Sequence, residues 1–308
     1  MRALHITGLV LTVSTCFAAD PVLDISKAAA ATLQIPGNPD FLAVDGDDVW
    51  ITNQGRVERL RCGDPRPITT VRMPQPAGAM AIGFGSLWVA SGGANGSLHR
   101  INRDTARVDT VIPTGLADPS GELSVAVGAG SVWLLTDAKG ELSRIDPATN
   151  AVVAKIAVLP DSFAAVFGFD AVWITNTKAN SVQRIDPVSN TVVATILVGP
   201  TPRFLAAGEH AVWTLNQGDG SVSRINVERN KVEATIHAGV EGEGGDIDVG
   251  QGRVWVRAAK VLLSVIDPGS NQVVRRYGPP AGSGAVRVAG PYVWVSAHDV
   301  TTVWVLRP

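Results

Sequence analysis

The chain has 308 residues, of which 45% are hydrophobic and 18% are charged, and its formal net charge is -2. This composition excludes an intrinsically disordered chain, because it supplies enough apolar side chains for a sizeable core. It also disfavours a nucleic-acid-binding protein, which would normally carry a strongly basic face or domain. We therefore expect no nucleic-acid partner.

The first twenty residues, "MRALHITGLVLTVSTCFAAD", have the layout of a secretory signal peptide. One Arg precedes an apolar run, which is too short to span a bilayer, and small residues follow. We predict a signal peptide over residues 1–19, cleaved after Ala18 or Ala19, and a periplasmic or secreted domain over residues 20–308. A lipid anchor at Cys16 is the alternative, although Thr15 is atypical before a lipidated Cys. No later run resembles a transmembrane helix.

A repeat of about forty residues runs through the rest of the chain. Its marker is a small apolar residue or Leu followed by Trp, at Trp50, Trp88, Trp133, Trp173, Trp213, Trp255 and Trp294. By subtraction, successive markers are 38, 45, 40, 40, 42 and 39 residues apart, which makes seven units. A regular period of this length is typical of propellers and solenoids.

Each unit reads as four short strands. In the unit around Trp213, runs rich in β-branched residues cover 204–207, 211–215, 221–225 and 231–236, and Gly, Asn and Asp clusters separate them. Four antiparallel strands repeated seven times predict an all-β fold, a seven-bladed β-propeller of four-stranded blades. A solenoid would need polar capping units at both ends, and none is present.

The two ends of the repeat complement each other. The segment "TTVWVLRP" (301–308) aligns with "NSVQRIDP" (180–187), so the last unit lacks its fourth strand. The missing strand matches "AAATLQIPGNP" (29–39), in which Thr32 occupies the place of Thr195. We predict that this N-terminal strand completes the last blade and closes the ring, which removes two open sheet edges.

The central repeat "VWITNTKANSVQRIDPVSNTVVATI" (172–196) resembles the repeats of the YVTN or YncE-like propellers. These bacterial exported proteins share a "V-[YW]-[VI]-[TS]-N" strand followed by an "I-D-[PT]-x-[TS]-[NG]" turn. The resemblance covers essentially the whole mature chain and implies a propeller fold. It constrains function little, because propellers of this kind serve as binding scaffolds, assembly platforms and occasionally enzymes.

Features present in most units are best explained by structure. The repeated tryptophans indicate core packing, and the acidic or amide residues of the "IDP" and "IN" turns indicate turn hydrogen bonds. The arginines at one position of the third strand are expected to cover apolar surface and pair locally: Arg100, Arg144, Arg184 and Arg224. The segment "VDGDDVW" (44–50) is more typical of a tight hairpin than of a calcium loop. We predict no cofactor.

Departures from the repeat need another reason. Counting seven or nine residues back from each Trp, and two forward, gives mostly small, apolar or hydroxyl residues. Units six and seven instead supply four charges, Asp246, Asp248, Arg257 and Arg287. They indicate either a structural salt-bridge network or a polar pocket at the channel mouth. In the second interpretation, five loop residues join them: Arg203, Glu243, Lys260, His298 and Asp299.

Two classes of function remain open. The first is an exported monomer that binds a protein or a small polar ligand through its channel mouth and loop-bearing face. Asn53, Asn176 and Asn216 follow the "V-W" strands on that face, where they either contact the ligand or cap the loops. The second class is a lyase or hydrolase. Streptogramin lyases are similar seven-bladed propellers that use closely spaced histidines and a divalent cation, but this sequence has no H-x-H.

Overall fold

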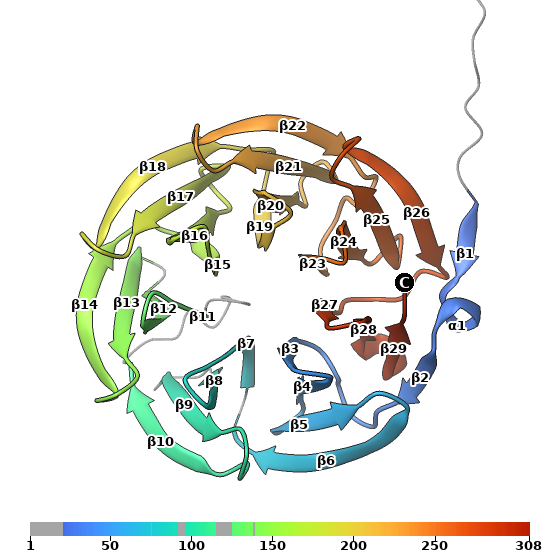
Figure 1. The fold of residues 1–308 in the computed structure, drawn as a ribbon, viewed down its shortest axis with the longest axis horizontal. Helices are drawn as coiled ribbons and strands as arrows, with labels where there is room; N and C mark the ends of the chain where they lie inside the picture. Colours follow the sequence, from blue (N-terminus) through green and yellow to red (C-terminus); the bar gives the residue numbers. More distant parts are fainter. Residues whose placement is uncertain (1–20, 75, 92–95, 115–124, 138) are drawn as a thin grey trace, which may run out of the picture.

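Seven β-sheets surround a central axis in the computed structural model of the protein, which describes residues 21–74, 76–91, 96–114, 125–137 and 139–308 (Figure 1). Each sheet is one blade, with its first strand at the centre of the ring and its last strand at the rim. Within each blade the four strands of the repeat pair antiparallel. The predicted seven-bladed β-propeller is confirmed.

The blades follow the chain order of the repeat. Blade 1 contains β3 (Leu42–Asp45), β4 (Asp48–Asn53), β5 (Arg56–Arg61) and β6 (Asp64–Arg72), and blade 2 contains β7 (Pro76–Gly83), β8 (Ser86–Ser91), β9 (Ser97–Asn102) and β10 (Val108–Pro113). Blade 3 contains β11 (Val125–Gly128), β12 (Ser131–Asp137), β13 (Glu141–Asp146) and β14 (Ala151–Ala157), and blade 4 contains β15 (Ser162–Gly168), β16 (Ala171–Asn176), β17 (Ser181–Asp186) and β18 (Thr191–Leu197). Blade 5 contains β19 (Pro202–Gly208), β20 (Ala211–Asn216), β21 (Ser221–Asn226) and β22 (Lys231–His237). Blade 6 contains β23 (Gly245–Gly250), β24 (Arg253–Ala258), β25 (Leu263–Asp267) and β26 (Gln272–Gly278). Blade 7 contains β27 (Val286–Ala289), β28 (Tyr292–Ala297), β29 (Thr302–Leu306) and, from the start of the chain, β2 (Ala31–Gln34).

The ring closes as the alignment of the chain ends predicts. Strand β2 pairs antiparallel with β29, and Thr32 lies opposite Trp304. In blade 4 the equivalent Thr195 lies opposite Gln183, so the register of the complete repeat is reproduced. Leu33 of β2 is only 2% exposed, which ties the first strand of the propeller into the core of its last blade.

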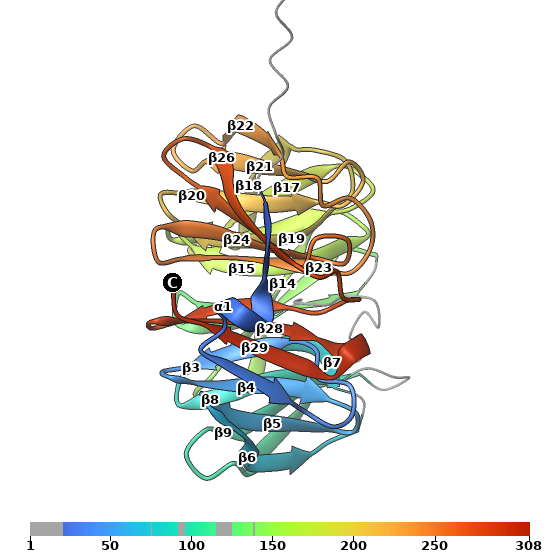
Figure 2. The same cartoon turned by 90° about the vertical axis from the view of Figure 1, so that its right-hand side faces the viewer.

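A short segment before β2 adds a contact that the repeat does not predict. Strand β1 (Val22–Asp24) pairs in parallel with β26 on the rim of blade 6, and α1 (Ile25–Ala28) follows it on the outside of the ring (Figure 2). Ile25 is fully buried in the cluster that contains Trp255 and Trp304. Ser26 accepts a hydrogen bond from Nε1 of Trp304 at 3.1 Å. This segment therefore joins blade 6 to blade 7 from the outside.

The repeated tryptophans form the core between blades, as predicted, and all seven are at most 1% exposed. The repeated arginines do more than cover them. Arg184 stacks over Trp173, with its guanidinium carbon 5.1 Å from the ring centre, and donates to Val227 O and Asn230 Oδ1 of the next blade. Arg100, Arg144 and Arg224 repeat both contacts. Each of these arginines thus fastens its blade to the following one.

Blades 6 and 7 lack this arginine. The residue opposite the blade tryptophan on the third strand is Val265 in blade 6 and Val305 in blade 7. A valine can fill the apolar surface but donates no side-chain hydrogen bond to the next blade. Polar contacts that join blade 6 to blade 7 must therefore come from other positions.

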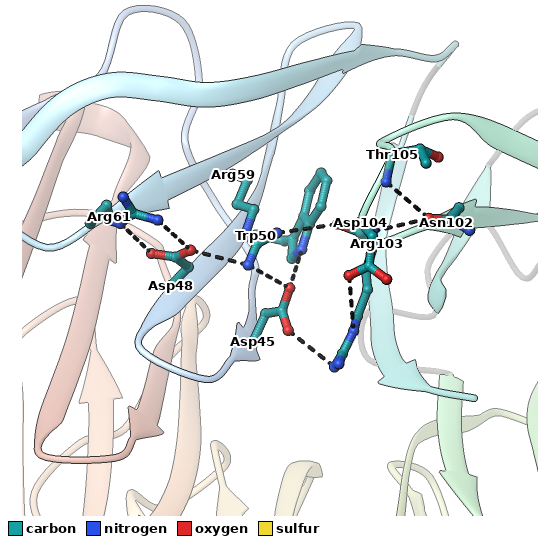
Figure 3. A network of polar contacts seen from close by, with 9 residues as sticks. All are labelled: Asp45, Asp48, Trp50, Arg59, Arg61, Asn102, Arg103, Asp104 and Thr105. Carbon is teal, nitrogen blue, oxygen red and sulfur yellow. Dashed lines mark hydrogen bonds and ion pairs between the residues drawn. The ribbon is translucent and has the colours of Figure 1, made fainter. Parts of the chain in front are cut away.

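The acidic hairpin of blade 1 is a structural network (Figure 3). Asp45 accepts a hydrogen bond from Nε1 of Trp50 at 3.2 Å, and its oxygens lie 3.2 Å from Arg59 and 3.3 Å from Arg103. Asp48 contacts Arg59 and Arg61, both at 3.1 Å. Because arginines already surround both carboxylates, the predicted tight hairpin fits this segment better than a calcium loop does.

Candidate functional site

An aromatic layer lies across the middle of the ring. Phe41 of blade 1 and Phe204 of blade 5 each stand nine residues before the tryptophan of their blade, and their ring centres are 6.3 Å apart. Phe163 of blade 4 meets Phe204 edge-on at 5.7 Å. All three rings are at most 5% exposed. This layer lies between two hollows, which are lined by different levels of the inner strands.

The first hollow, here called the inner cavity, has a volume of about 240 Å³. Apolar residues six to eight positions before the blade tryptophans form most of its wall, among them Ile82, Val127 and Leu205. Asp248 and Arg287 are its charged lining residues. Both residues therefore line the inner cavity and not the mouth pocket, where the sequence had suggested a polar site.

The second hollow, here called the mouth pocket, has a volume of about 350 Å³ and is lined mainly by residues at or just before the starts of first strands. Its lining residues come from blades 1, 5, 6 and 7: Asp40, Arg203, Glu243, Gly244, Ser283 and His298. Three of the predicted loop residues, Arg203, Glu243 and His298, are thus brought together here. Acidic and basic groups share one pocket at the channel entrance.

Arg287 pairs with Asp246, as the salt-bridge interpretation of the four charges allows. Arg287 Nη1 donates to Asp246 Oδ2, and the same oxygen accepts the N–H of Val286 at 3.1 Å. Asp248 instead accepts the N–H of Val288 at 2.7 Å. Two carboxylates of β23 thus satisfy N–H groups along the edge of β27, which joins blade 6 to blade 7 where the arginine contact is missing.

Arg257 is a structural residue and not part of a ligand pocket. Its side chain is fully buried, and it donates to Ser296 O at 3.0 Å, to Ala281 O at 3.1 Å, to Gly282 O at 2.7 Å and to Ala258 O. Burial lowers its pKa to about 10, so it remains charged at neutral pH. A guanidinium that is occupied by four carbonyls has little capacity left for a ligand.

Two other predicted loop residues lie outside the mouth pocket. Lys260 is exposed and pairs with Glu241, with 2.8 Å between Nζ and Oε1. Asp299 is half-exposed and lies 2.7 Å from His298 Nδ1, so it contacts a pocket residue but does not line the pocket. Neither side chain is needed to describe the pocket.

The three asparagines cap loops. Asn53 accepts from the N–H groups of Asn38 and Gln54 and donates to Pro36 O. Asn176 likewise donates to Pro160 O and accepts the Ala179 N–H, whereas Asn216 donates to the hydroxyls of Ser221 and Ser223. All three are at most 3% exposed. The loop-capping interpretation therefore fits them, and we leave them out of the site.

Asp40 is the pocket residue that the sequence comparison missed. Burial raises its pKa to about 7, and the nearby carboxylates of Asp246 and Asp299 raise it further, against the opposing effect of Arg257. Asp40 lies ten residues before Trp50, and Arg203 lies ten before Trp213. Most other units have Gly or an apolar residue at that position, so a count of ten residues back would have identified both charges.

Replacing Asp40 with Asn should make the protein more stable at alkaline pH. Because the folded-state pKa of about 7 exceeds the ordinary value of 3.8, the folded state holds a proton that the unfolded state has released. Stability contributed by that proton is complete below pH 4 and is lost as the pH rises toward 7. We expect Asp40→Asn to raise the unfolding free energy by about 2–4 kcal/mol at pH 8 and by little at pH 4.

Thermal denaturation at both pH values measures this difference. Asp104→Asn is the matched control, because the Asp104 side chain is 83% exposed and should show no such dependence. An Asp40→Asn variant that is less stable than wild type at pH 8 would contradict the assignment of Asp40 as a carboxylate held in an unfavourable environment.

Among the residues that the structure describes, no group of three or more His, Cys, Asp or Glu side chains could hold a metal ion. In the same part of the chain, no helix has both the length and the apolar character needed to cross a bilayer. The predicted signal peptide lies outside the described residues.

Comparison with known proteins supports the fold. No protein-family model matches the chain, and no curated protein matches it by sequence. The chain is similar to the crystal structure of BamB from Moraxella catarrhalis, with a TM-score of 0.63, 13% sequence identity, and coverage of 87% of this chain and 84% of that chain. At this identity the likeness shows a β-propeller fold alone, and the resemblance to YncE-like repeats stays a prediction.

Proposed function

We propose that the protein is an exported binding module that holds a small polar ligand in the mouth pocket. One observation carries this proposal: two ionisable side chains that line the pocket have buried polar atoms without a hydrogen-bond partner among the described residues. The buried Nε of Arg203 and the buried Oδ1 of Asp40 both lack a hydrogen-bond partner among the described residues. Buried polar groups are normally paired, and unpaired ones are typical of places where a ligand or ordered water completes the bonding.

The rest of the ring suits a scaffold. The arginine contacts between blades and the closure by β2 hold the ring of blades together, so the pocket walls are set before any ligand arrives. A preformed pocket avoids the entropic cost of ordering loops on binding. Its volume of about 350 Å³ lies at the lower end of the range for small-molecule sites.

Export rests on the segment before β1. The layout of residues 1–19 favours a periplasmic or secreted location, and a lipid anchor at Cys16 is the alternative form of export. N-terminal sequencing of the mature protein separates the two, because cleavage near Ala19 gives soluble protein and lipidation gives a modified Cys16.

A ligand screen by thermal denaturation tests the binding function. Small acids, amines, zwitterions and divalent cations are each added at millimolar concentration to wild type and to Arg203→Met. We expect at least one compound to raise the melting temperature of wild type by several degrees and to have little effect on the variant. If no compound stabilises wild type, the small-ligand function is wrong, and a protein partner on the same face becomes the better explanation.

An enzyme is the second candidate, and the mixed charge of the mouth pocket is the observation that favours it. Glu243 and His298 could act as base and acid toward a bound substrate. A lyase of the streptogramin type would also carry a divalent cation. Measurement of metal content in protein purified without chelators tests this alternative, since a stoichiometric divalent cation would favour the enzyme over the binding module.

A further inference from the structure

Arg203 presents an unpaired guanidinium to the mouth pocket. It donates no side-chain hydrogen bond and joins no ion pair with any described residue. Its position is nevertheless fixed. The guanidinium carbon lies 4.7 Å from the centre of the Phe163 ring, and the backbone carbonyl of Arg203 accepts a hydrogen bond from Thr175 Oγ1 at 3.1 Å. A guanidinium that lies over an aromatic ring can still donate hydrogen bonds to a planar anion.

Asp40 presents an unpaired carboxylate to the same pocket. No described group donates a hydrogen bond to either of its oxygens, and Oδ1 is buried. Its backbone is also fixed, because its carbonyl accepts a hydrogen bond from Ser296 Oγ and its N–H donates to Thr52 O. The exposed carboxylate of Glu243 lines the pocket as well and forms no ion pair with a described residue. The pocket therefore contains two carboxyl side chains that form no ion pair with a described residue.

The opposite charges do not neutralise each other across the pocket. Arg203 belongs to blade 5 and Asp40 to blade 1, and their charged atoms are not within the 4.0 Å of an ion pair. Equivalent hydroxyl bonds from the preceding blades hold both backbones at the same level of the ring. Contacts between blades therefore fix the backbone positions of both residues.

We propose that the mouth pocket binds a small zwitterion, with its anionic group on Arg203 and its ammonium group on Asp40 and Glu243. This inference rests on the proposed binding function and names its ligand class. A carboxylate can accept hydrogen bonds from the guanidinium of Arg203, and an ammonium can donate to carboxylates. A ligand with one charge would leave the opposite side of the pocket unpaired.

The aromatic layer limits how the ligand sits. Phe41, Phe163 and Phe204 lie beneath the pocket and are themselves buried, so a ligand stays at the level of Asp40 and Arg203. The inner cavity beyond them has a different lining, in which Arg287 is already paired with Asp246. The ligand is therefore a compact molecule that carries both charges close together.

A series of ω-amino acids tests both the charge and the spacing. Glycine, β-alanine, γ-aminobutyrate and ε-aminocaproate carry the same two groups at increasing separation, and butyrate and butylamine each carry one of them. Isothermal titration calorimetry gives the dissociation constant of each compound. We expect one member of the series to bind at least about tenfold more tightly than either single-charge compound.

Matched variants show which residue binds the anionic end of the zwitterion and which binds its ammonium end. Arg203→Met should abolish the advantage of the zwitterion over butylamine, and Asp40→Asn should abolish its advantage over butyrate. Arg66→Met, at an exposed arginine of blade 1, is the control and should bind like wild type. Unchanged melting temperatures in Arg203→Met and Arg66→Met show that a loss of binding does not reflect unfolding.

The outcomes separate this inference from the binding function. If butyrate or butylamine binds as tightly as the best zwitterion, the ligand class is wrong while the mouth pocket remains a binding site. If none of the zwitterions binds but another compound of the thermal screen does, the ligand class is again wrong. If no compound binds in either experiment, the binding function itself fails.

Discussion

Deleting residues 21–36 is expected to prevent the propeller from closing. The deletion removes β1, α1 and β2, so blade 7 keeps three strands and β29 gains an open edge. It also removes the buried side chains of Ile25, Leu33 and Ile35, each of which is at most 2% exposed. Loss of one such side chain costs about 2–4 kcal/mol, so the sum approaches the entire stability of a typical domain.

Single substitutions test the same prediction if the protein that lacks residues 21–36 does not fold at all. Leu33→Ala should destabilise by about 2–4 kcal/mol through blade 7, and Ile25→Ala should cost a similar amount through the cluster with Trp255 and Trp304. Denaturant unfolding measures both. We also expect a synthetic peptide of residues 21–36 to restore the deleted protein to a soluble monomer. A deletion variant that is monomeric and melts with wild type would show that the closure by β2 does not hold the ring.

The fold could be predicted because the same pattern of strands recurs in seven aligned units of the sequence. One ambiguous run, such as 204–207, gains weight when six aligned runs show the same alternation. The closure was also predictable, because the unit that lacks a strand and the spare strand at the other end share one register. Strand β1 and α1 were not predictable, since they have three and four residues, belong to no repeat, and depend on the edge that β26 leaves uncovered.

The site was predicted only in part. Comparing repeat positions identified Asp246, Asp248, Arg257 and Arg287 as unusual, and the structure brings all four to blades 6 and 7. It could not show their partners. Two of the four carbonyls that Arg257 meets belong to the loop before β27, and the path of that loop is set by tertiary contacts. Position in a repeat fixes the direction of a side chain, whereas its hydrogen bonds depend on the neighbouring blade.

The position of the four charges has a structural explanation. Arginines opposite the blade tryptophans join blade 2 to blade 3 and continue to the contact between blades 5 and 6, as Arg100 and Arg224 illustrate. In blade 6 the equivalent residue is Val265, so the polar contacts between blades 6 and 7 come from the inner strands instead. Asp246 and Asp248 of β23 then take over the attachment of blade 7. The charges of units six and seven thus replace a contact that the other blades make nearer the rim.

Replacing Asp246 with Ala should cost roughly 3–5 kcal/mol of unfolding free energy. Burial raises the pKa of this fully buried carboxyl to about 6, so its charge is held at a cost even beside Arg287. Removal of the carboxylate is still unfavourable, because the guanidinium of Arg287 and the N–H groups of Ile247 and Val286 lose their acceptor. Denaturant unfolding at pH 8, where Asp246 is ionised, measures the change.

The double variant Asp246→Ala with Arg287→Ala separates the charge pair from the backbone bonds. Removal of both charges should recover part of the loss, because no uncompensated guanidinium then remains, while the two N–H groups still lack an acceptor. Asp248→Ala is the matched control: it stands two residues along β23 and accepts one N–H, so a loss of about 1 kcal/mol is expected. Blade 6 has no arginine contact to blade 7 near the rim, so Asp246→Ala should loosen this interface before any other. Amide hydrogen exchange would detect the loosening as lost protection in β27. Equal losses in Asp246→Ala and Asp248→Ala, with no recovery in the double variant, would show that the ion pair contributes nothing beyond its backbone bonds.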